Sequence, residues 1–506
     1  MDTKSLRKAL NDGEPIDVGA LLDFIERLQS VLQKAEAKAL ELEKMVEKLS
    51  GSVRLEDPYS VSAEEKRQQE RELKKSRKAR DKTLKQKLGR RSNDTKLKAA
   101  ERIERVIPEG FTEDQCVLSH VRPVFRFESN RALIVAYEVW VHRPTKTYGK
   151  IPGVIGRSGY GLEFILAVAY QVYSLGLSFD KVALLTQFFQ GLKIGKSQID
   201  AMLNQLARHL EREFDNLCSL VANSMILHAD ETSWSINSVW AFVTESARVL
   251  LHGVHKDAST LEVIVNPAMF GGLVVSDDAA VYSRFNKTQK CWAHLLRKSI
   301  RICLLQPNDQ RFEALRDGLF EIYRKAVRLQ DDRRYQDEGR RDAVYRLQDK
   351  LHDLICVECE IHEGQCYQGA LEEFRLLINE LLKLSVDESL FSFVTTPPAP
   401  RPNGTELQAS GTNNEAERTL RLTAKARKCD QASKTVRGAR RRTIIVSTME
   451  SVRYFVRTYT LATITAEILS WTANGVSCFE LHLQSITNAQ RLKNTLAKLY
   501  PTAAIT

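Results

Sequence analysis

The chain has 506 residues, with 75 Lys and Arg against 64 Asp and Glu, so its formal net charge is +11. This length exceeds what one hydrophobic core usually organises, and the basic excess favours a polyanionic partner such as nucleic acid. Nine scattered cysteines and the lack of an apolar leader exclude a secreted disulfide scaffold and predict a reducing cytoplasm.

Apolar residues recur at alternating steps of four and three from Leu21 to Leu49, with Glu and Lys on the flanks. This heptad pattern is typical of a short coiled coil that joins two copies of a chain. An amphipathic helix that packs on the protein's own core is the alternative, although its apolar face is usually wider. We therefore predict an N-terminal helix or coiled coil in residues 1–56, and a homodimer or higher oligomer.

Residues 57–110 are rich in Lys and Arg, as in KKSRKAR and KQKLGRR. Such a run is typical of a linker or an exposed helix, and either could touch phosphates without reading bases. In residues 111–150 the runs VRPVFRF and LIVAYEVWVH predict two or three strands of a small β module. The sequence does not indicate what this module does.

Residues 151–222 are predicted to be helical. Their most apolar stretch, from Leu162 to Leu177, is interrupted by Glu163 and Gln171. It is shorter than the roughly 20 residues that a bilayer span needs, so we expect a core helix and no membrane anchor.

A helical hairpin is predicted at the end of this region. Ser178 can start a helix that ends near Gly191, and Gly195 can precede a second helix that runs to about His209. Two helices joined by so short a turn resemble a helix-turn-helix, and a plain αα-hairpin of a bundle is the alternative. In the DNA-binding interpretation, the contacting residues are Lys196, Ser197 and Gln198, with Asn204 near the same face.

Short apolar runs then alternate with turn-like and helical segments in the order β-β-β-α-β-α-β, with the last strand expected at TQKCWAH. Helical spacing from Phe312 to Leu354 and from Leu371 to Leu384 predicts a helical insertion. The predicted segments are residues 223–300 for the first part of an α/β core, 301–408 for the insertion, 409–475 for the second part of the core and 476–506 for a C-terminal tail.

Three acidic residues stand at positions suited to metal ligands. Asp230 in HADET and Asp277 in SDDAA close strand-like runs, and Glu417 in NNEAER opens a helix. Successive strand residues point to opposite faces, so Glu231 and Asp278 cannot share a face with the aspartates before them. Carboxylate oxygens suit Mg²⁺ or Mn²⁺, and two such ions roughly 3.5–4 Å apart can cut or join phosphodiester bonds.

Each acid also has a structural alternative. An Asp at a strand end is more often a turn or cap residue than a ligand. On the helix, Thr412 with Glu415 fits a capping box, and Asn414 with Glu417 fits it as well. The second register would give Glu417 a capping role instead.

The sequence motifs around these acids resemble those of a known family. HADET, SDDAAVY, CWAHLLRK and NNEAERTLR, in this order, resemble the signature blocks of the insertion-sequence-66 transposases. The resemblance extends over residues 177–209 and 225–474. It implies an α/β, ribonuclease H-like catalytic domain with a large helical insertion, preceded by a coiled coil and a helical DNA-binding region. In that fold Asp230 and Asp277, on the first and fourth strands, lie side by side, and Glu417 completes a catalytic, metal-binding trio.

The resemblance further implies metal-dependent cleavage and strand transfer at the inverted-repeat ends of a mobile element. The implied cofactor is Mg²⁺ or Mn²⁺, as two ions, and the implied partners are double-stranded DNA and accessory proteins encoded by the element. We expect the protein in the cytoplasm, at the nucleoid when bound to DNA. His294, expected on the last strand, is a candidate accessory contact to phosphate or water. A catalytically inactive DNA-binding descendant of such an enzyme is the alternative.

Basic residues follow the acidic blocks closely. Arg437 and Arg440 to Arg442 add positive charge near Glu417, and a solvated basic face is the alternative to DNA contact. Zinc is not expected, because Cys116 stands alone where family members often carry paired cysteines, and the thiols near His352 fit a buried helix face. We expect phosphate contacts from Arg297, Lys298, Arg418, Arg421, Lys425 and Arg427.

Overall fold

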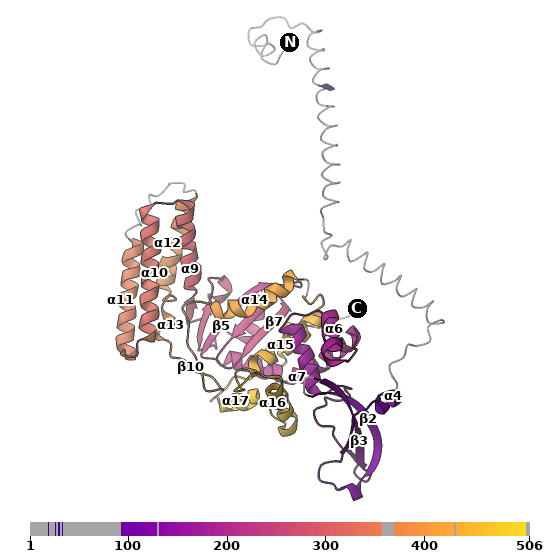
Figure 1. Ribbon diagram of the computed structural model, residues 1–506. Coiled ribbons are helices and arrows are strands. Elements are labelled where there is room, and N and C mark those ends of the chain that lie inside the picture. Colours follow the sequence, from indigo (N-terminus) through magenta and orange to yellow (C-terminus); the bar gives the residue numbers. More distant parts are fainter. Residues whose placement is uncertain are drawn as a thin grey trace, which may run out of the picture. The chain divides into compact units, whose positions relative to one another are not determined.

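The computed structural model (Figure 1) describes residues 93–128, 131–356, 369–429 and 432–501, together with residues 19, 26, 29, 30 and 33. The chain divides into two compact units, residues 1–92 and 93–506. The predicted coiled coil and most of the basic stretch belong to the first unit and lie outside the described residues, apart from those five positions. The fold below is that of the second unit.

A small β module opens the second unit. Its strand order is β1-β3-β2, with β4 paired to β3. Val124, Val135 and Tyr137 form its buried centre. The first strand lies within the stretch predicted as a linker, and it pairs in parallel with β3. The elements are α4 (Asn93–Lys98), β1 (Arg102–Val106), η1 (Glu113–Gln115), β2 (Val117–Glu128), β3 (Arg131–His142) and β4 (Thr147–Tyr148).

Three helices follow, and the predicted hairpin is among them. Helix α5 (Leu162–Tyr173) is a core helix, as expected. Ser178 caps α6 (Phe179–Gln190), and Gly191 ends it with φ of 66°, a left-handed conformation that glycine adopts without steric cost.

Helix α7 (Lys196–Ala222) continues 13 residues beyond the predicted end at His209, because buried residues such as Phe214 and Leu217 extend its apolar face. Across the described residues, no helix combines the length and the hydrophobicity of a membrane span.

A five-stranded mixed sheet forms the centre, in the order β7-β6-β5-β8-β9. The first three strands form an antiparallel meander, and β8 and β9 run parallel to β5. The first and fourth strands in chain order are therefore neighbours. The elements of this region are β5 (Ile226–Ser233), β6 (Ser238–Val243), β7 (Arg248–Val254), α8 (Ala258–Ile264), β8 (Leu273–Ser276), η2 (Ala280–Tyr282) and β9 (Thr288–Lys290).

Two predictions for this region were wrong. The short helix expected between β8 and β9 is a single 3₁₀ turn, η2. The last strand ends at Lys290, and α9 (Trp292–Leu305) begins within the CWAH block, so His294 lies in the first turn of a helix and not on a strand. The apolar residues of CWAH are followed at helical spacing by Leu295, Leu296 and Ile302, which are buried in the insertion core.

The two faces of the central sheet are covered by different helices. One face, with Leu227, Trp240 and Val274, packs into a core shared with α5, α7 and the C-terminal helices. On the other face, Val239 and Ala241 pack against α14. Because side chains alternate along β5, Asp230 lies on the face that α14 covers.

The helical insertion is present as a bundle (Figure 1), and its core also includes Ile226, Leu273 and Val275 of the central sheet. The amphipathic spacing seen in the sequence is the physical reason, since each helix buries one apolar stripe against the others. The elements are α9, α10 (Gln310–Asp331), α11 (Asp337–Cys356), α12 (Ala370–Val386) and α13 (Ser392–Thr395), followed by the two-residue strands β10 (Ala399–Pro400) and β11 (Glu406–Leu407).

Five helices follow in the described residues 414–501, and α15 closes one edge of the sheet. The backbone N–H groups of Arg248, Leu250 and His252 on β7 donate to hydroxyls at three positions four residues apart on α15. These acceptors are Thr443, Ser447 and Ser451. The helices are α14 (Asn414–Lys428), α15 (Val436–Val452), α16 (Leu461–Asn474), α17 (Cys478–Ser485) and α18 (Thr495–Leu499).

Candidate active site

The carboxylates of Asp230 and Asp277 lie at matching positions on neighbouring strands. In the parallel pair of β5 and β8, His228 lies opposite Val275. Each aspartate comes two residues further along its own strand direction, so both occupy the same end of the sheet and the same face. Asp277 lies just past the end of β8, where its carboxylate accepts the N–H of Ala279 at 3.1 Å.

Asp230 is largely withdrawn from water, and it has acidic neighbours. The pKa of its carboxyl group is raised from 3.8 to about 7, chiefly by burial and also by the charges of Glu231, Asp277 and Glu417, against a backbone hydrogen bond that lowers it. Desolvated carboxylates that repel one another favour a proton or a cation between them. All three predicted ligands therefore contribute to one electrostatic site.

Asn413 fixes the start of α14 against the strand ends. Its side-chain amide donates to the carbonyl of Ala229 at 2.7 Å, and its backbone N–H lies 3.2 Å from the sulfur of Cys291. Glu417 follows one helical turn later, and its N–H bonds to the carbonyl of Asn413 at 3.1 Å. Asn413 is 1 % exposed. Sequence reasoning missed this residue, although it stands inside the NNEAER block.

The structure contains neither of the capping boxes considered for α14. The N-cap is Asn413, and its side chain caps no backbone group because the amide is engaged by Ala229. Glu415 instead pairs with Arg418 at 3.1 Å and lies 3.8 Å from Arg248. Glu417 is consequently free of a capping role.

The CWAH block holds the second part of the core in place. The backbone N–H of Trp292 donates to the carbonyl of Gly411, just before α14, and its indole N–H donates to Leu390 in the insertion. His294 Nε2 lies 4.0 Å from Glu417 Oε1, so the histidine does reach the edge of the site.

Among the described residues, one group of side chains places its ligand atoms close enough together to hold a metal ion. Cys291, His294 and Glu417 offer ligand atoms within 4.8 Å of one another. However, the Cys291 thiol accepts a hydrogen bond from Asn413, and burial raises its pKa, which disfavours the thiolate that binds zinc. The carboxylate oxygens of Asp230, Asp277 and Glu417 do not form such a close group among the described residues, but their chemistry fits a hard cation such as Mg²⁺ or Mn²⁺ better.

A comparison with known protein families assigns the chain to one of them. The family model described as Transposase IS66 family matches residues 157–441, more than half of the chain. This chain belongs to the IS66 transposase family. No curated protein matches it in a sequence search. The matched range includes Asp230, Asp277 and Glu417. Transposases act on DNA, and those of the DDE type generally use divalent metal ions.

Within this IS66 transposase, the predicted DNA-binding residues near Glu417 differ in their partners. Arg297 lies 3.4 Å from Glu417, Arg418 pairs with Glu415, and Lys298 pairs with Glu380 on α12. Arg427 donates to the carbonyl of Ser233 at 2.6 Å, beyond Asp230 on β5. Arg421 and Lys425 are exposed one turn apart on α14, with no hydrogen bond or ion pair to the described part of the chain.

Three of the basic residues at the start of α15 make contacts within the protein, and DNA contact by this cluster stays a prediction. Arg440 pairs with Glu211, and Arg441 pairs with Asp200. Arg442 is buried, with its guanidinium over the rings of Tyr173 and Trp234. These contacts hold Arg440 and Arg441 in ion pairs and bury Arg442, while the Arg440 side chain stays 36 % exposed.

The predicted DNA-binding residues of the hairpin lie at the exposed start of α7 in this transposase. Lys196 pairs with Asp180 of α6 at 2.7 Å. Gln198 accepts the N–H of Gly195 and donates to the hydroxyl of Tyr160. Ser197 is exposed. An ion pair and hydrogen bonds of its own polar side chains therefore stabilise the hairpin. DNA contact by these three residues stays a prediction.

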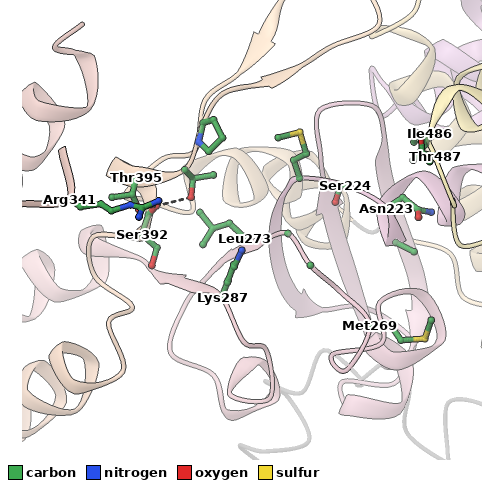
Figure 2. A pocket seen from close by; sticks show the side chains of 16 residues that line it. Asn223, Ser224, Met269, Leu273, Lys287, Arg341, Ser392, Thr395, Ile486 and Thr487 are labelled. Carbon is green, nitrogen blue, oxygen red and sulfur yellow. Dashed lines mark hydrogen bonds between the residues drawn. The ribbon is translucent and has the colours of Figure 1, made fainter. Parts of the chain in front are cut away.

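An open cavity of about 720 Å³ lies at the other end of the sheet (Figure 2). Leu273, which starts β8, lines it together with Ser224, Lys287 and Arg341. Asp277 follows the opposite end of β8, so this cavity is separate from the carboxylate site. Its lining includes no acidic residue, so it offers a metal ion no carboxylate ligand.

Proposed function

We propose that the chain is a DDE-type transposase with a ribonuclease H-like core, in which Asp230, Asp277 and Glu417 are the catalytic, metal-binding trio. The strand order β7-β6-β5-β8-β9 supports this, because it makes the first and fourth strands neighbours. The observation that carries the proposal is the register of β5 and β8, which places Asp230 and Asp277 at the same end and on the same face of the sheet, where burial and the charges of Asp277 and Glu417 raise the pKa of Asp230. Such electrostatic crowding is costly in a metal-free fold and is typical of sites that bind cations.

Mg²⁺ or Mn²⁺, as two ions, would be held by these carboxylate oxygens. When bound, the ions supply activation of the attacking oxygen and stabilisation of the leaving oxygen. Asn413 keeps Glu417 against the strand ends through its bond to Ala229. The protein's part is to hold the carboxylates rigidly and to exclude competing ligands.

In the proposed reaction, water first attacks a phosphodiester at each inverted-repeat end. The bond from phosphorus to the 3′-oxygen breaks, and the element keeps a free 3′-hydroxyl. That hydroxyl then attacks a phosphodiester of target DNA, so one phosphorus–oxygen bond forms as another breaks. Neither step needs ATP or a covalent protein intermediate. Double-stranded DNA is the substrate, and oligomerisation and accessory proteins stay part of the proposal.

DNA cleavage by single carboxylate variants tests this function. Asp277→Asn keeps the size of the side chain but removes a charged ligand, so we expect Mg²⁺-dependent nicking of a duplex with the element's end to fall at least 100-fold. Asp230→Asn and Glu417→Gln should behave alike. Asp353→Asn, on the exposed face of α11, is the control and should cleave normally. Retained cleavage by Asp277→Asn would rule out the trio.

A catalytically inactive DNA-binding protein is the second candidate, and one observation favours it. Arg297 lies 3.4 Å from Glu417, where it competes with a cation for the carboxylate. Its side chain is 59 % exposed, so it can swing into solvent or onto a phosphate. An inactive protein would bind DNA in a salt-dependent way, without Mg²⁺-dependent nicking, and Arg297→Ala would not create nicking.

A further inference from the structure

A buried hydrogen bond ties the segment after Asp277 to the strand that carries Asp230. Tyr282, at the end of η2, donates its hydroxyl proton to Glu231 Oε2 at 2.7 Å. Tyr282 is fully buried, and the Glu231 side chain is 2 % exposed. Glu231 directly follows Asp230, and η2 directly follows the turn at Asp277. The bond therefore links the two halves of the candidate site.

This bond lies on the opposite face of the sheet from the three carboxylates. Glu231 and Asp230 are successive residues of β5, so their side chains point to opposite faces. Consistently, Tyr282 packs edge-on against Trp240 in the core on that opposite face. Glu231 thus cannot join the proposed metal ligands, but it can determine where they lie.

Lys290 holds the other end of the same segment. Its ammonium group donates to the backbone carbonyl of Asp277 at 3.0 Å, and it lies 3.7 Å from Asp278. Its side chain is 7 % exposed and passes over the ring of Tyr282, 5.9 Å from the centroid. The segment from Asp277 to Tyr282 is therefore fixed at its first residue by Lys290 and at its last by Glu231.

We infer that Glu231, Tyr282 and Lys290 are positioning residues that set the separation of the Asp230 and Asp277 carboxylates for metal binding. The inference rests on the proposed function and adds three residues to it. Asp277 lies beyond the last residue of β8, so strand pairing alone does not fix it. The ties on the opposite face supply that constraint, as outer-shell contacts commonly do at metal sites.

The charges in this network are balanced, which makes the ties stable. Lys256, 61 % exposed, lies 3.2 Å from Glu231 Oε1 and neutralises the buried carboxylate from outside. Burial and the nearby carboxylates raise the pKa of Tyr282 well above its ordinary value, so its hydroxyl stays a donor throughout the working pH range. Charge-assisted hydrogen bonds in a dry environment are the stronger kind.

Manganese binding to the full chain without DNA tests the inference. Tyr282→Phe removes one hydroxyl and keeps the ring, so we expect the dissociation constant for Mn²⁺, measured by calorimetry, to rise about 10- to 100-fold. The Mg²⁺ concentration for half-maximal cleavage should rise with it, while the rate at saturating Mg²⁺ changes less. Glu231→Gln should weaken Mn²⁺ binding too, and the double variant should be no worse than the more impaired single variant.

Tyr500→Phe is the matched control. Tyr500 is also buried, and its hydroxyl donates to the carbonyl of His252 at 2.8 Å, away from the carboxylates. This control should lower the stability without changing Mn²⁺ affinity. Should Tyr282→Phe fail to fold, Glu231→Gln carries the same test. Wild-type Mn²⁺ affinity in both single variants would overturn the inference, whereas a wild-type protein that binds no Mn²⁺ would overturn the proposed function instead.

Discussion

At the scale of single residues, the site is defined by unfavourable electrostatics in the metal-free protein. Asp230 is mostly buried, and its charged form is opposed by desolvation and by three neighbouring carboxylates. Those same features strengthen the attraction for a divalent cation, because a desolvated site screens charge poorly. Asp230 thus destabilises the folded, metal-free protein and at the same time favours the binding of a divalent cation, as residues of functional sites often do.

The pH dependence of the stability of Asp230→Asn tests whether the buried Asp230 carboxylate destabilises the folded protein. Without metal, the carboxyl titrates near 3.8 when unfolded and at about 7 when folded. The folded state binds more protons between these values, so wild-type stability falls as pH rises through that window and is level above it. Asparagine abolishes this loss. Measured in EDTA, the melting temperature of Asp230→Asn relative to wild type should be higher at pH 8 than at pH 5 by about 1–3 °C.

Asp353→Asn serves as the control for this experiment too, because Asp353 is exposed on α11 and has no ion pair among the described residues. Its melting temperature relative to wild type should be the same at both pH values. An Asp230→Asn difference that also stays constant with pH would contradict the account of a crowded, desolvated carboxylate.

At the scale of elements, α15 replaces a missing strand at the edge of the sheet. An open edge leaves N–H groups unpaired, and proteins cover such edges. Thr443, Ser447 and Ser451 meet this need because four helical residues advance about 6 Å and two strand residues about 6.6 Å. Close approach is required as well, and a side chain at Gly253 would come within 2.8 Å of Ala439 on α15.

Ser447→Ala tests this edge contact. It removes the acceptor that lies 3.0 Å from the buried N–H of Leu250, so the free energy of unfolding should fall by about 1–3 kcal/mol. Chemical denaturation measures the change. Ser470→Ala is the control, since that hydroxyl bonds only to its own helix, and it should have a much smaller effect. Equal effects of the two substitutions would show that the edge contact contributes nothing.

Elements with strong local signals could be predicted from the sequence, and elements fixed by distant contacts could not. Ser178 and Gly191 bound α6 as expected, since capping and left-handed glycine act locally. The family blocks led to the three carboxylates, whose catalytic role stays a prediction. The role of Asn413 depends on Ala229, 184 residues away, and no local pattern reveals such a contact. The CWAH block was wrongly predicted to be a strand, because short apolar runs fit a strand and a buried helix alike.

At the scale of the whole molecule, the chain has a net charge of +11, and within the part that the structure describes some of the positive charge is paired. Several arginines form ion pairs within the protein, as Arg440 and Arg441 do. Arg421 and Lys425 remain exposed on α14, the helix that also carries Glu417. We therefore expect the DNA backbone to lie along this face of α14.

The salt dependence of DNA binding tests that path. Each phosphate contact contributes about 0.9 to the slope of log K against log salt. The double variant Arg421→Ala with Lys425→Ala should reduce the slope on duplex DNA by about 2. Arg333→Ala with Arg346→Ala, on the exposed surface of the insertion, makes the same change in charge and should leave the slope almost unaltered. An equal reduction in both double variants would indicate a diffuse charge effect instead of contact by α14.

The central claim is that three acids far apart in the sequence share divalent metal. Anomalous X-ray diffraction from crystals soaked in Mn²⁺ tests it, because the anomalous signal at the absorption edge distinguishes manganese from other atoms. We expect density about 2.0–2.2 Å from carboxylate oxygens of Asp230 and Asp277, with Glu417 as a ligand of the same site. A soaked crystal with manganese only at Cys291 and His294, or with none near Asp230, would contradict it.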